Sequence, residues 1–170
     1  MKGLWALAER PDPQALHEYV TAPYPSYLSL QTALHAHGMI AQIPSLIYLV
    51  SLARSGRVQT GLATYSVHHV RAELFRGFDS MESGIKLAQP EKALIDFLYL
   101  SPTRGRLFGA LPELELPRGF SRAAAWEWAR RIPSARLRTV VERRLGAVLD
   151  AARGVRRRRG AGRTGLRRRG

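Results

Sequence analysis

The segment Gly84–Leu100 constrains the fold most, because it places a short strand, residues 84–88, directly before a helix. Pro90 suits the first position of that helix, where the missing N–H is not needed for a hydrogen bond. Glu91 follows in the first turn, where the helix dipole favours a negative charge. Apolar residues then cover so much of the helix that we expect it to be buried. They are Ala93, Leu94, Phe97, Leu98 and Leu100.

A second block, Pro25–Ile40, predicts another helix upstream. Ser29 is a residue type favoured at a helix N-cap, and Gly38 lies where a C-cap glycine is expected. Strand-like runs at about 46–52 and 58–70 separate the two blocks, and residues 77–83 look like a polar loop. These elements predict an α+β domain with a small mixed β-sheet and flanking helices.

The ordered pair of blocks resembles the AbiEi family of antitoxins, which belong to type IV toxin–antitoxin (abortive-infection) systems. The first block supplies Ser-Tyr-x-Ser-x-x-x-Ala-Leu-x-x-His-Gly and the second supplies Pro-Glu-Lys-Ala-Leu-x-Asp. The resemblance covers about residues 3–100. It implies a protein that opposes a nucleotidyltransferase-like toxin without forming a stable complex with it, and that takes part in repressing its own operon. Because the chain has no cysteine, no apolar run of membrane length and no signal-peptide core, we expect a cytoplasmic location.

Members of that family typically begin with a winged-helix DNA-binding domain, and the resemblance places residues 1–8 as the last strand of such a wing. The domain resembling the antitoxins then covers residues 1–101. Three explanations stay open for the missing winged helix. The chain is a fragment or shortened gene product, its start was assigned too late, or residues 1–8 are a lone strand without DNA-binding ancestry.

Charge is distributed very unevenly along the chain. Residues 1–119 hold 11 basic and 10 acidic residues, whereas residues 153–170 hold 9 arginines and no acidic residue. The segment 153–170 has too few large apolar residues to form a core, so we expect it to be disordered. Its arginines could neutralise nucleic-acid phosphates without reading sequence. A read-through or frameshifted end from a GC-rich genome explains the same composition equally well.

Between these regions, residues 102–120 form a Pro/Gly-rich connection, and residues 121–152 predict a two-helix appendage. The second of these helices has an arginine-rich face. That face is either a solvated surface or a continuation of the basic segment as a surface for nucleic acid or an acidic partner. The candidate nucleic-acid-binding residues are Arg136, Arg138, Arg143, Arg144, Arg156, Arg157, Arg158, Arg159, Arg167, Arg168 and Arg169.

No catalytic or metal-binding pattern emerges. The chain has no cysteine, and its histidines lack the spacing and the neighbouring carboxylates of a metal site. Glu91 and Asp96 would point about 140° apart on a helix, and Lys92, four residues from Asp96, is a simpler partner for it. No run of 18 apolar residues predicts a membrane span. We therefore expect a non-enzyme without cofactor, metal or membrane.

Two functions follow as expectations. The first is a non-catalytic antitoxin of the kind described above. The alternative is a nucleic-acid-binding transcriptional regulator, or a fragment of one, that acts through its basic C-terminal region. For the fold, we predict that five apolar side chains are buried together where the two motif helices cover the sheet. They are Leu34, Leu49, Leu94, Phe97 and Leu98.

Overall fold

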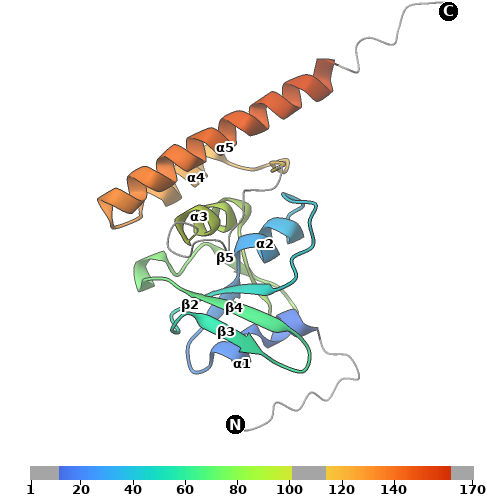
Figure 1. The fold of residues 1–170 in the computed structure, drawn as a ribbon, viewed down its shortest axis with the longest axis vertical. Coiled ribbons are helices and arrows are strands. Elements are labelled where there is room, and N and C mark those ends of the chain that lie inside the picture. Colours follow the sequence, from blue (N-terminus) through green and yellow to red (C-terminus); the bar gives the residue numbers. More distant parts are fainter. Residues whose placement is uncertain (1–11, 101–113, 162–170) are drawn as a thin grey trace, which may run out of the picture.

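A computed structural model describes residues 12–100 and 114–161, with side chains described through residue 152. Within these ranges the chain is an α+β protein, as predicted, in which a mixed sheet is covered by helices (Figure 1). The helical elements are η1 (Pro13–Leu16), α1 (His17–Thr21), α2 (Leu30–Ala36), η2 (Ala72–Leu74), α3 (Pro90–Leu100), α4 (Arg122–Arg130) and α5 (Ala135–Ala161). No helix among the described residues has the length and apolar character to cross a membrane.

Six strands in the described part of the chain form one sheet with the order β3-β4-β2-β1-β6-β5. The pairs β2–β4 and β1–β6 are parallel, and the other neighbours are antiparallel. The first motif block contributes β1 at the centre of the sheet, and the second contributes β6 beside it. The strands are β1 (Ser26–Leu28), β2 (Ile47–Ser51), β3 (Gly56–Gln59), β4 (Thr64–His69), β5 (Phe78–Ser80) and β6 (Lys86–Ala88).

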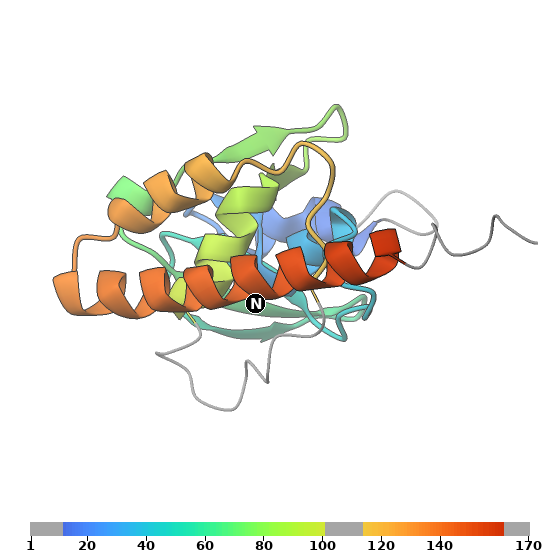
Figure 2. The ribbon, with the colours of Figure 1, turned by 90° about the horizontal axis from the view of Figure 1, so that it is seen from above.

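The helices lie in layers on the sheet. Helices α2 and α3 cover one face, the pair α4–α5 lies outside them, and α1 lies on the opposite side of the sheet (Figure 1). Seen from above, α5 runs across α3 and its C-terminal end reaches toward the edge of the folded body (Figure 2). The larger hydrophobic core therefore lies between the sheet and the α2–α5 helices.

The predicted burial of five apolar residues is confirmed, but their grouping is wrong in one case. Leu34, Leu94, Phe97 and Leu98 share the core under the helices. Leu49 belongs to a second cluster on the opposite face of the sheet. Successive strand residues point to opposite faces, so Tyr48 and Val50 join the core under the helices and Leu49 faces away.

Two strands were not predicted. Residues 77–83 were expected to be a polar loop, yet Phe78–Ser80 forms the edge strand β5. Strand β1 lies between Pro25 and the predicted N-cap Ser29, where no strand was expected. Both strands are only three residues long, too short for a visible alternation of polar and apolar residues.

Helix α5 continues beyond the predicted end near residue 152. It reaches Ala161. The disorder expected for residues 153–170 stays a prediction. Arginine and alanine are good helix formers, and no proline interrupts the segment, so a helix anchored by its packed first half continues. The rest of the expected disordered segment, the wing remnant at 1–8 and most of the Pro/Gly-rich connection lie outside the described residues.

Candidate functional site

The two motif blocks meet in a buried polar cluster, which we call the motif cluster: Tyr27, Ser29, Lys92 and Asp96. The hydroxyls of Tyr27 and Ser29 donate to Oδ2 of Asp96 at 2.9 and 2.8 Å. The ammonium of Lys92 donates to the Tyr27 hydroxyl at 2.8 Å and to Oδ1 of Asp96. The predicted Lys92–Asp96 pair is thus confirmed, and both side chains are 2% exposed.

The buried polar groups of the motif cluster form hydrogen bonds with one another. Each carboxylate oxygen of Asp96 accepts at least one hydrogen bond, which offsets the cost of burying its charge. Burial lowers the pKa of the Lys92 ammonium, and the charge of Asp96 opposes that shift. Burial also raises the pKa of the Tyr27 phenol, and the charge of Asp96 adds to that shift. Tyr27 therefore stays a neutral donor, and the cluster ties β1 to α3.

Ser29 has a different role from the one predicted. It occupies the N-cap position of α2, but its side chain makes no capping hydrogen bond. Its hydroxyl bonds to Asp96 instead. The next residue, Leu30, is fully buried and has a φ of 50°, an unfavourable angle for a residue with a Cβ. The start of α2 is therefore shaped by the motif cluster rather than by local capping.

Aromatic side chains enclose the motif cluster. The ring of Tyr27 stacks on Phe78 with 4.7 Å between centroids, and Phe75 lies 5.2 Å away. The Lys92 ammonium lies 5.5 Å from the ring centroid of Trp128 on α4, within cation–π range. Trp128 also fits over Gly77, where a Cβ atom would approach the indole to 2.5 Å. A cluster formed by the motif blocks thus also holds the α4–α5 pair.

A second buried polar group, His17, Thr21 and Ser26, joins α1 to β1. The backbone N–H of Lys86 donates to Nε2 of His17, so Nδ1 carries the ring proton and donates to Oγ of Ser26 at 3.0 Å. Burial lowers the pKa of His17, which favours this neutral ring. Thr21 adds a hydroxyl 3.0 Å from the same Oγ. These hydrogen bonds fix α1 to β1, which indicates a structural role for the group.

The other titratable residues are dispersed. Glu91 accepts the backbone N–H of Ser121 at 2.5 Å, whereas Asp96 lies in the motif cluster, so these two carboxylates have separate partners. His37 bonds to the carbonyl of Ala88 at 2.7 Å. Across the described residues, no three metal-ligating side chains come together.

The structure describes four of the predicted nucleic-acid-binding arginines in full. Arg136 and Arg143 are exposed on α5, and Arg144 is half-buried. Arg138 donates to the carbonyl of Ile132 at 3.2 Å, so it helps to hold the turn after α4. Of the remaining predicted residues, Arg156, Arg157, Arg158 and Arg159 lie on α5 with side chains outside the described part, and Arg167, Arg168 and Arg169 lie outside it altogether.

Sequence reasoning identified Lys92 and Asp96 as partners but not as buried ones, and it missed Tyr27 and Trp128. The burial of Lys92 and Asp96 could have been predicted from the apolar residues around them. A helix that is apolar on most sides is buried, and its charged residues are then buried with it. The contacts to β1 and α4 join residues far apart in sequence, and no local pattern encodes them. No protein-family model matches the chain, and no curated protein matches it significantly.

Proposed function

We propose that this protein is a non-catalytic antitoxin resembling the AbiEi family, which opposes a nucleotidyltransferase-like toxin in the cytoplasm. The observation that carries the proposal is the motif cluster. The Tyr27 and Ser29 positions of the first block and the Lys92 and Asp96 positions of the second meet in one hydrogen-bonded group. The residues behind the resemblance therefore form a single structural unit, as two parts of one family signature should.

The arrangement of the motif cluster supports a structural role rather than catalysis. All four residues of the motif cluster are buried, so the motif cluster offers no access to a substrate. Their donors and acceptors are used within the group. A function as a folded antagonist, acting through its surface and without a cofactor, is consistent with this arrangement.

Growth rescue tests the proposal. If a nucleotidyltransferase gene is found beside this one, it would be expressed from an inducible promoter with the intact protein or an empty vector. We expect the intact protein to restore growth without co-purifying with the toxin, since antagonism in type IV systems does not use a stable complex. Continued growth arrest with soluble, folded protein present would refute the antitoxin assignment.

A second candidate function is binding of nucleic acid by the basic C-terminal region. It is favoured by the exposed Arg136 and Arg143 on α5, a helix that leads into the arginine-rich residues 153–161. Binding of this type should be nonspecific and strongly salt-dependent. We expect deletion of residues 153–170 to remove most of the affinity for an operator fragment and for a scrambled duplex alike. A preference for the operator, or unchanged affinity after deletion, would exclude this mode of binding.

A further inference from the structure

An open pocket of about 590 Å³ lies where β2 and β4 end. These strands are parallel, with Ser51 opposite His69, so their carboxyl ends lie at the same edge of the sheet. The lining residues are Leu52, Arg54 and Ser55 from the loop after β2, and His69 at the end of β4. The depression is open to solvent, and residues from the loop after β2 and from the end of β4 meet at it.

Hydrogen bonds hold two of the lining residues in place. The backbone N–H of His69 donates to Oγ of Ser55 at 2.7 Å. Nδ1 of His69 lies 3.2 and 3.3 Å from the carbonyl oxygens of Leu52 and Ala53. Because both neighbours are acceptors, Nδ1 carries the ring proton. This leaves Nε2 of His69 and the hydroxyl proton of Ser55 without partners among the described residues.

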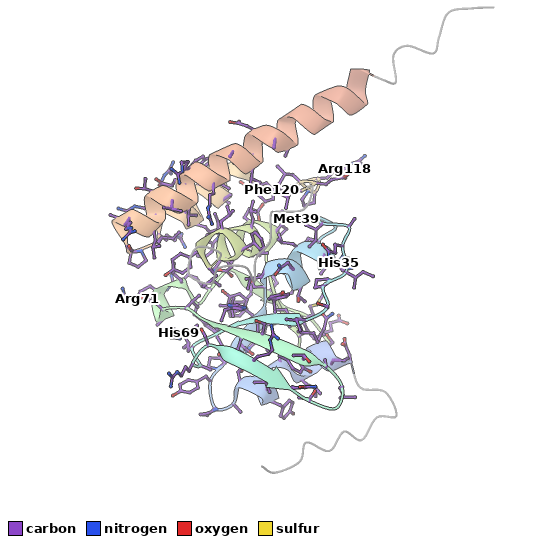
Figure 3. All side chains as sticks on the ribbon, in the orientation of Figure 1. His35, Met39, His69, Arg71, Arg118 and Phe120 are labelled. Carbon is purple, nitrogen blue, oxygen red and sulfur yellow. The ribbon has the colours of Figure 1, made fainter. Side chains whose placement is uncertain are left out.

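The pocket is positively charged. Arg54 is exposed and forms no ion pair with any carboxylate in the described part of the chain, and no acidic residue lines the pocket. Just beyond β4, Glu73 pairs with Arg71 at 3.8 Å. Figure 3 shows Arg71 on the same side of the molecule as His69. Arg54, Ser55 and His69 thus present donors or cationic groups to one space.

We propose that this pocket binds the phosphate group of a small phosphate monoester. The guanidinium of Arg54 has paired N–H groups that match two oxygens of a phosphate. The Ser55 hydroxyl donates to a third oxygen. Nε2 of His69 accepts a hydrogen bond from the P–OH group of a phosphate monoanion. Leu52 provides an apolar wall for the ester group. The site is independent of the antitoxin proposal, because no residue of the motif cluster lines it.

Two-dimensional NMR of the ¹⁵N-labelled protein tests the site. Inorganic phosphate and adenosine monophosphate would be titrated separately at constant ionic strength, with chloride as the comparison anion. We expect saturable shifts at the His69 ring and at the Ser55 amide. The variant Arg54→Gln should weaken binding about tenfold or more, because a charged hydrogen-bonding group is lost. The variant Arg57→Gln is the matched control, since it removes the same charge from exposed β3 outside the pocket, and it should change affinity by less than about twofold.

Three results would overturn the proposal. The first is a response to phosphate no larger than that to chloride. The second is equal weakening by Arg54→Gln and Arg57→Gln, which would indicate general charge attraction. The third is a short DNA duplex that shifts the same residues at much lower concentration than adenosine monophosphate does, which would identify a surface for phosphodiesters. A well-dispersed spectrum of each variant would establish that it is folded.

Discussion

Replacing Gly77 with alanine should destabilise the protein because Trp128 occupies the space that a side chain would need. Gly77 has a φ of 80°, and an added Cβ would lie 2.5 Å from the indole of Trp128 and 3.1 Å from Cγ of Lys92. The left-handed backbone angle costs about 1–2 kcal/mol for a residue with a Cβ. Overpacking against the indole adds about 1–3 kcal/mol. The free energy of unfolding should therefore fall by about 2–5 kcal/mol.

Gly84 provides the control for this prediction. Its φ of 79° is nearly the same, but a Cβ there meets no atom within 4 Å. Gly84→Ala should therefore show only the backbone cost of about 1–2 kcal/mol. Urea unfolding would be measured for each variant alone and in combination with Trp128→Leu. This comparison separates the backbone cost from the cost of packing against the indole. Equal costs for Gly77→Ala and Gly84→Ala, or no relief of Gly77→Ala by Trp128→Leu, would contradict the proposed packing of α4 on the motif cluster.

Three further predictions concern the core. Lys92→Met should reduce the free energy of unfolding by about 3–5 kcal/mol because it leaves Asp96 charged and buried, and a second change, Asp96→Leu, should recover much of that loss in urea titrations. Leu94→Ala should cost about 2–5 kcal/mol in the same assay, since its side chain is fully buried, and a loss below 1 kcal/mol would contradict the core assignment. His17 has a lowered pKa, so the unfolded chain binds more protons just below pH 6.5 and stability should fall as the pH falls through that region. His17→Gln should flatten that pH dependence of the unfolding free energy. An unchanged slope would show that His17 is not its cause.

Local sequence signals predicted most helices well. Pro90 is the first residue of α3, as its sequence position predicted. Gly38 ends α2 with a φ of 65°, and its N–H donates to the carbonyl of His35 at 2.9 Å. The N–H of Met39 donates to Leu34 at 2.8 Å, which completes a Schellman motif. Such caps depend on residues close in sequence, so they are readable without the fold.

The parts that sequence did not predict depend on distant contacts. Tyr27 bonds to Asp96 across 69 positions of sequence, and this pairing takes Ser29 away from its expected cap. The place of Trp128 depends on the open backbone at Gly77, which no spacing rule connects to it. The pocket at Arg54 and His69 likewise requires the parallel pairing of β2 and β4. Motif spacing drew attention to Ser29, Lys92 and Asp96, but only the fold shows what they contact.

The most direct test of the antitoxin proposal is growth rescue by a chain that ends after Ala152. This chain keeps the motif cluster and the buried α5 residues Leu145 and Leu149, but lacks the arginine-rich segment. Co-expressed with the toxin, it should restore growth as fully as the intact protein does, while its affinity for duplex DNA falls sharply. A truncated chain that is folded and soluble yet fails to rescue growth, beside an intact chain that succeeds, would place the function in the basic segment and contradict the proposal.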